Sequence, residues 1–131
     1  MEQEKTLSDS SESHGYRVEI FTKLPSLNTY IEVCRRSRYE ANDFKKKLER
    51  EILKYFMIPR IEKPVKIHFH WVEANKRRDL DNIAFAKKFI LDAMVRGGYL
   101  KDDNRKCVTG FTDSFEYGDA YKVILEIKED L

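Results

Sequence analysis

Apolar and polar residues alternate in three segments of the chain, which is the pattern of a β-strand with one buried face. These segments are YRVEIFTKL (residues 16–24), KPVKIHFHWVEA (63–74) and AYKVILEIKED (120–130). A fourth strand is predicted in KCVTGFTDSF (106–115), with an interruption at Gly110. The alternation in residues 63–74 is the most regular, and its apolar positions are Val65, Ile67, Phe69 and Trp71.

Two other segments repeat apolar residues at three- and four-residue steps, which predicts helices. The first covers residues 39–57, and Pro59 lies just beyond its end. Residues 30–38 fit either a longer helix or a break at RRSR. The second helix covers residues 83–98 and ends at two glycines. On a helical wheel its buried stripe consists of Ile83, Ala86, Ile90, Ala93, Met94 and Gly97.

The order β-α-β-α-β-β predicts an α+β fold. We expect a mixed, mostly antiparallel sheet of about four strands with two main helices packed on it. The first 15 residues are polar and lack periodicity, so they are predicted to be a disordered N-terminal tail. Residues 16–131 are then one domain, as the length of 131 residues suggests.

Charge distribution is more informative than the net charge, which is only +2. The first residues are acidic, whereas residues 59–106 hold twelve Lys/Arg and seven Asp/Glu. This pattern fits a nucleic-acid partner, although an ordinary solvated surface would look similar. The two cysteines form no CxxC motif, which disfavours a zinc site and fits a reducing cytosol. With no long apolar run and no signal-peptide pattern, a cytoplasmic protein without a membrane partner is expected.

The stretch KRRDLDN (residues 76–82) places three cations directly before Asp79 and Asp81, at the start of the second helix. Acidic residues there are commonly caps that interact with the helix dipole. The alternative is a metal site beside a polyanion. The wheel puts Asp81, Lys88 and Asp92 on one polar side, and Asp102 and Asp103 follow in the next turn.

A metal site of this kind suits the hydrolysis of a phosphodiester. A few carboxylates hold Mg²⁺ while leaving positions for water and phosphate oxygen. Asp79, Asp81 and Asp103 would form the cage, and Lys88 would stabilise charge that develops on the phosphate. Lys76, Arg77 and Arg78 would offset the repulsion between the acids and DNA. Spacing alone leaves both interpretations open.

The segment RRDLDNIAFAKKFILDAMVRGGYLKDD (residues 77–103) closely resembles the signature region of the RusA-like family of Holliday junction resolvases, which occur in phages and prophages. The family pattern is D-x-D-N, a helix with a lysine and D-A-L, and then G-x-x-x-D-D. The upstream PSLNTY (25–30) resembles the family's P-S-x-N-x-Y element. The matching positions are Asp79, Asp81, Asn82, Lys88, Asp92-Ala93-Met94, Gly98 and Asp102-Asp103.

The resemblance implies a homodimeric, Mg²⁺-dependent endonuclease that nicks four-way DNA junctions symmetrically in recombination and repair, with Mn²⁺ as a substitute ion. Its catalytic carboxylates correspond to Asp79, Asp81 and Asp103, and its essential lysine to Lys88. About three extra residues separate Asn82 from Lys88 compared with the shortest members, so Lys87 is an alternative for the lysine.

The partner implied is branched DNA rather than a small molecule. The predicted DNA contacts are Lys76, Arg77, Arg78, Arg35, Arg36, Arg38 and Asn28, although Asn28 could instead cap a helix. Asp92 is expected to hold Lys88. His68 and His70 share one strand face but lack an obvious third metal ligand. Two other functions stay open: a DNA-junction-binding protein without turnover, and a nuclease for other branched DNA such as flaps.

Overall fold

A computed structural model describes residues 15–130. The predicted disordered tail, residues 1–15, lies outside this range except for Gly15, which begins the first strand. The chain forms β1 (Gly15–Ile20), α1 (Leu27–Arg36), α2 (Arg38–Leu53), β2 (Val65–Glu73), α3 (Leu80–Ala84), α4 (Lys87–Arg96), β3 (Val108–Tyr117) and β4 (Lys122–Glu129). The predicted α+β class is confirmed.

The four strands form one mixed sheet in the order β1-β4-β2-β3. The β4 strand pairs antiparallel with both β1 and β2, whereas β2 and β3 run parallel. The pairing of β2 with β3 shifts register between Val65 and Lys66, because Val65 lies opposite Val108 and Lys66 opposite Gly110. The interruption predicted at Gly110 is therefore a bulge at the start of β3.

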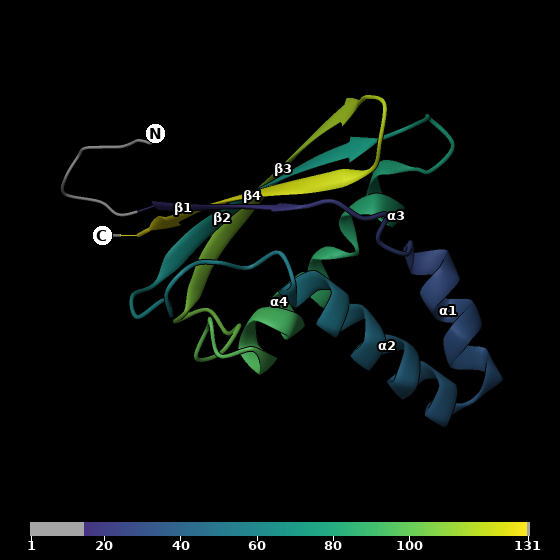
Figure 1. The fold of residues 1–131 in the computed structure, drawn as a ribbon, viewed down its shortest axis with the longest axis horizontal. Helices are drawn as coiled ribbons and strands as arrows, with labels where there is room; N and C mark the ends of the chain where they lie inside the picture. Colours follow the sequence, from purple (N-terminus) through teal and green to yellow (C-terminus); the bar gives the residue numbers. More distant parts are fainter. Residues whose placement is uncertain (1–14, 131) are drawn as a thin grey trace.

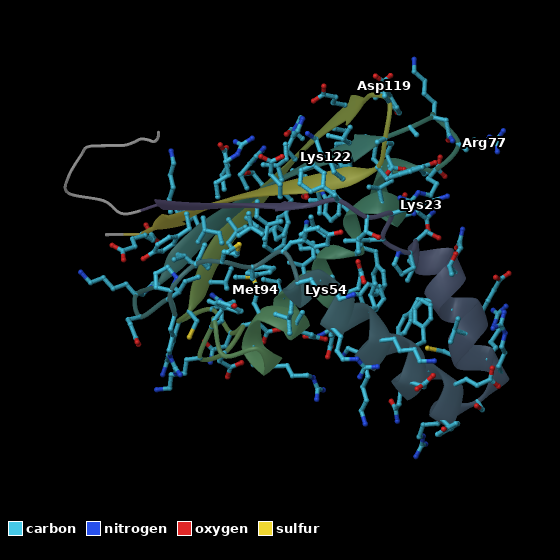
Figure 2. The ribbon with its side chains drawn as sticks, in the orientation of Figure 1. Lys23, Lys54, Arg77, Met94, Asp119 and Lys122 are labelled. Carbon is cyan, nitrogen blue, oxygen red and sulfur yellow. The ribbon has the colours of Figure 1, made fainter. Side chains whose placement is uncertain are left out.

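The helices cover one face of the sheet (Figure 1). The apolar positions predicted for residues 63–74 all point into this interface, where Val65, Ile67, Phe69 and Trp71 are buried. The predicted helical stripe is also buried from Ile83 to Met94, and Phe89 joins it in the core. Figure 2 shows Met94 between the helices and the sheet, and Arg77 at the outer rim of the molecule.

The first predicted helix, residues 39–57, corresponds to α2, which ends earlier, at Leu53. The chain breaks before it at Ser37, inside RRSR, so residues 30–38 do not continue one long helix. Ser37 has an extended backbone, and its side chain accepts a hydrogen bond from the Glu40 amide as the N-cap of α2. The second predicted helix is divided into α3 and α4 at Phe85 and Ala86.

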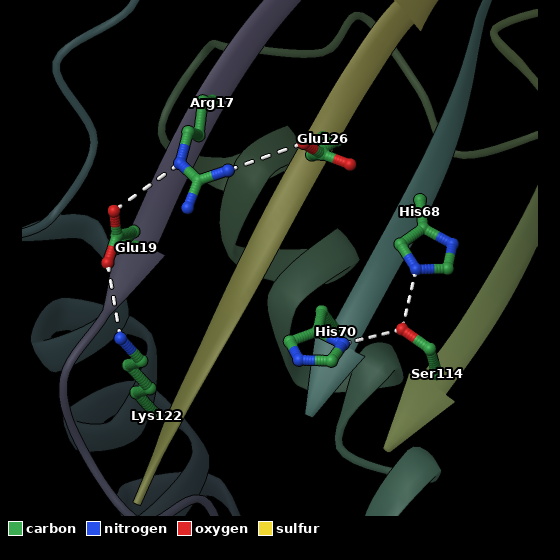
Figure 3. Close-up of polar contacts among 7 residues, drawn as sticks. All are labelled: Arg17, Glu19, His68, His70, Ser114, Lys122 and Glu126. Atoms are coloured by element: carbon green, nitrogen blue, oxygen red, sulfur yellow. Dashed lines mark hydrogen bonds and ion pairs between the residues drawn. The ribbon is translucent and has the colours of Figure 1, made fainter. Parts of the chain in front are cut away.

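The opposite face of the sheet carries polar side chains (Figure 3). There Ser114 lies 2.7 Å from His68 Nε2 and 2.6 Å from His70 Nδ1. His70 Nε2 also lies 2.5 Å from Glu116 Oε1, and Arg17 pairs with Glu126 at 3.3 Å. The histidine contacts join β2 to the edge strand β3, and the Arg17–Glu126 pair joins β1 to β4, so both histidines have hydrogen-bonding roles in the sheet.

No helix in the described range is long and apolar enough to cross a bilayer.

Candidate active site

Arg78, one of the predicted DNA contacts, is held inside the protein. Its Nε and Nη2 donate to the two carboxylate oxygens of Glu73 at 2.9 and 2.8 Å, and its Nη1 donates to the Leu24 carbonyl at 2.8 Å. Glu73 is buried, so the planar guanidinium neutralises a charge that would otherwise be costly to bury. Arg78 therefore anchors the loop that carries Asp79.

Asp79 and Asp81 begin α3, and both are exposed. Asp79 occupies the N-cap position, yet its side chain makes no capping hydrogen bond. Asp81 accepts only from the next backbone amide, that of Asn82, at 3.0 Å. The pair therefore has the position expected for capping, with Asp79 at the N-cap and Asp81 in the first turn, but the Asp79 carboxylate makes no capping hydrogen bond and is available to a ligand.

The two segments that carry the family resemblance, residues 25–30 and 77–103, contact each other at the start of α3. The backbone amide of Asn28 donates to Asn82 Oδ1 at 3.3 Å. Ser26, rather than Asn28, caps α1 by accepting from the Thr29 amide at 3.2 Å. The PSLN segment, residues 25–28, is consequently fixed beside the start of α3, and Asn28 is exposed.

Asp103 lies at the other end of the sheet from Asp79 and Asp81. The acidic pair follows the last residue of β2, whereas Asp103 precedes the first residue of β3. Since β2 and β3 run parallel, the loop that carries the acidic pair and the turn that carries Asp103 leave opposite ends of the sheet, and β2 spans nine residues, or roughly 30 Å, between those ends. Among residues 15–130, no three His, Cys, Asp or Glu side chains gather to hold a metal ion. One chain alone therefore does not fit the predicted three-carboxylate magnesium site.

Asp102 stabilises the turn that holds Asp103. Its two carboxylate oxygens accept from the Asp103 amide at 2.7 Å and from Asn104 Nδ2 at 3.1 Å. Asp103 itself lines a cavity of about 410 Å³ together with Lys45, Glu49, Asp92, Val95 and Arg96. The Asp103 carboxylate thus faces side chains of α2 and α4 and not the start of α3.

Lys88 and Lys87, the two candidate lysines, have different surroundings. The side chain of Lys87 is only 13% exposed, and its Nζ lies 2.7 Å from Asp113 Oδ2 on β3. Lys88 is 58% exposed and pairs with Asp92 at 3.2 Å, as the sequence predicted. An exposed amine is the one that can reach a DNA phosphate, so the geometry favours Lys88 over Lys87.

Asp92 accepts a second cation that the sequence did not suggest. Lys45 of α2 places its Nζ 2.6 Å from Asp92 Oδ2. Burial acts to raise the pKa of Asp92, but hydrogen bonds from Lys45 and Lys88 outweigh burial and hold this pKa below its ordinary value. Asp92 therefore stays ionised. No local pattern relates Lys45 to Asp92, because the two helices meet only through tertiary packing.

The remaining predicted DNA contacts form two exposed groups. Lys76 and Arg77 lie in the loop before Asp79, and Lys76 Nζ stands 5.2 Å from the centre of the Tyr117 ring. Arg35, Arg36 and Arg38 surround the break between α1 and α2. The ten residues of α1 separate this second group from Ser26 by about 15 Å, so it is farther from the acidic pair than the sequence suggested.

Comparison with known proteins finds one family model that fits this chain. The model described as "Endodeoxyribonuclease RusA" matches residues 12–128, which is nearly the whole chain. No curated protein sequence matches.

Proposed function

Since the chain belongs to the RusA family of endodeoxyribonucleases, we propose that it is a Mg²⁺-dependent nuclease that resolves four-way DNA junctions by paired, symmetric nicks in recombination and repair. The observation that carries the proposal is the exposed acidic pair. The Asp79 side chain makes no capping hydrogen bond, and the pair follows a loop whose exposed Lys76 and Arg77 can bind DNA phosphates. The protein would act in the cytoplasm of a bacterial cell, as a host or phage product.

We further propose that the working site is shared between two copies of the chain. Asp103 lies a strand's length from Asp79 and Asp81 within one chain, so a second copy has to supply the missing acid. Two copies packed antiparallel about a twofold axis would place Asp103 of each beside Asp79 and Asp81 of the other. Two such sites also match the pair of nicks that resolves a junction.

The magnesium ion would be held by this set of three carboxylates, with Mn²⁺ as a substitute. Bound there, the ion would activate water and stabilise charge on the scissile phosphate. The chain's own contribution is to orient the phosphate backbone. Lys88 would contact the phosphate near the reacting bond, while Lys76, Arg77 and the arginines between α1 and α2 would bind DNA farther away.

The test uses a labelled four-way junction, with Mg²⁺ or with EDTA. The wild-type protein should cut opposite strands at symmetric positions only with Mg²⁺. Asp103→Asn should lower the cutting rate about 100-fold, because a metal ligand is lost. Asp119→Asn, an exposed aspartate in the turn between β3 and β4, is the matched control and should cut normally.

Two other outcomes would replace the proposal. Tight junction binding without cutting by any variant would indicate a DNA-junction-binding protein without turnover. Faster cutting of flaps than of junctions would indicate a nuclease for other branched DNA.

A further inference from the structure

Asp92 bridges two ammonium groups. Its Oδ1 lies 3.2 Å from Lys88 Nζ and its Oδ2 lies 2.6 Å from Lys45 Nζ. One carboxylate cannot neutralise two lysines, so this trio carries one uncompensated positive charge. The side chains of Asp92 and Lys45 are 17% and 29% exposed, compared with 58% for Lys88. Lys45 is therefore the inner, more fixed of the two cations.

Glu49, a second acid beside Lys45, does not neutralise this charge. Glu49 is buried, and Arg96 Nε lies 2.6 Å from its Oε1. The contact is ionic, since neither Glu49 oxygen has an aligned hydrogen-bond donor. Lys45 Nζ is 4.0 Å from Glu49 Oε2, beyond hydrogen-bonding distance. Arg96 thus neutralises Glu49, and Lys45 keeps N–H donors for another partner.

Lys45 also shares the Asp103 cavity. The cavity of about 410 Å³ is lined by Lys45, Asp92 and Asp103, together with Glu49, Val95 and Arg96. Lys88 stands on the outer side of Asp92 and is not among these lining residues. A phosphate that approaches Asp103 through this cavity would consequently meet Lys45 and Arg96, and of these two cations Arg96 is already paired with Glu49.

Resting on the proposed nuclease function, we propose that Lys45 is a phosphate-contacting residue in the Asp103 half of the site, and that Asp92 is the positioning residue that holds it there. The family resemblance assigns the functional lysine to α4 alone, whereas this contact comes from α2. Lys45 supplies a positive charge and a donor to a phosphate oxygen, and Lys88 acts from the outer side of the same carboxylate.

The test compares Lys45→Gln with Lys54→Gln, in which an exposed lysine of the same helix region, paired only with Glu51, is changed. Junction affinity is measured in EDTA over a range of salt concentrations, and single-turnover cutting is measured with Mg²⁺. Lys45→Gln should make the plot of log affinity against log salt less steep, by the amount expected for the loss of about one phosphate contact. It should also slow cutting about 100-fold. Lys45→Arg should restore the slope, and Asp92→Asn should slow cutting with little change of slope.

The salt dependence separates this inference from the nuclease function. If the wild-type protein binds junctions without cutting them, the nuclease function falls, while the slope still decides whether Lys45 contacts phosphate. A Lys45→Gln slope equal to that of Lys54→Gln overturns the role of Lys45, even if junctions are cut. Failure of the wild-type protein to bind junctions overturns both. Thermal unfolding of each variant identifies losses that come from misfolding.

Discussion

At the scale of single residues, the neighbouring lysines Lys87 and Lys88 differ in burial and in their partners. Lys87 is enclosed at the β3 edge, where its Nζ pairs with Asp113 and lies 4.0 Å from the centre of the Phe111 ring. Asp113 accepts a second hydrogen bond from the Trp71 indole at 2.8 Å. The helical wheel places Lys88 on the exposed side, as the structure does, but it gives no sign of Asp113, which lies 26 residues away from Lys87 in the sequence.

Replacing Asp113 with alanine tests this structural role. The change leaves the largely buried Lys87 ammonium and the Trp71 indole without their acceptor, so we expect the free energy of unfolding to fall by about 2 kcal/mol. Urea denaturation followed by the fluorescence of the single tryptophan would measure it. Adding Lys87→Met should recover much of the loss. A loss no larger than that of the exposed Asp119→Ala variant would contradict the assignment.

Asp92 should give stability that depends on pH. Its pKa is lower in the folded protein than in the unfolded chain, so its contribution is present above the ordinary pKa of about 4 and disappears as the pH falls through the lowered value. Wild type should therefore be more stable than Asp92→Asn at pH 7, with the difference shrinking below about pH 4. Urea denaturation across this range is the measurement, and a difference that is constant with pH would contradict the explanation.

At the scale of elements, the break between α3 and α4 is a tight turn within one amphipathic segment. Ala86, Lys88 and Phe89 each donate to the carbonyl three residues earlier, at 3.2, 2.9 and 3.0 Å. This is the pattern of a tighter helix with three residues per turn. Ile83 before the turn and Ile90 after it are both buried.

The break between α1 and α2 depends on Ser37. Its side chain accepts from the Glu40 amide at 3.0 Å, so Ser37→Ala leaves the first turn of α2 without its cap. We expect the free energy of unfolding to fall by about 1 kcal/mol. Ser37→Asp keeps an acceptor there and should retain most of the stability. Chemical denaturation compares the two, and equal losses would show that the cap is not the cause.

The buried faces of strands and helices could be predicted, because burial repeats every second residue in a strand and every three to four residues in a helix, and the apolar residues follow these repeats. Val18 and Ile20 in β1 and Val123 and Leu125 in β4 are buried as the alternation predicts. Strand direction was harder to predict, because the parallel pairing of β2 with β3 depends on where the connecting helices return the chain. The same pairing determines the position of Asp103, so the acids could be identified from the sequence while their separation could not.

At the scale of the whole molecule, the separated acids make a shared site testable by mixing variants. Asp79→Asn and Asp103→Asn proteins should each be nearly inactive alone. In a mixed dimer, one site takes both altered residues and the other takes Asp79 and Asp103 intact. Mixing after brief partial unfolding should therefore restore nicking on one strand of the junction. If each site lay within one chain, no mixture would regain activity, and the shared site would be refuted.

The parallel pair of strands has a consequence for how far apart two cuts can fall. In the proposed dimer, each reaction centre would join one end of a sheet to the opposite end of its neighbour. The interval between the two centres would then depend mainly on the span of β2, whose nine residues extend roughly 30 Å. The spacing of the two incisions would thus be set by the protein scaffold.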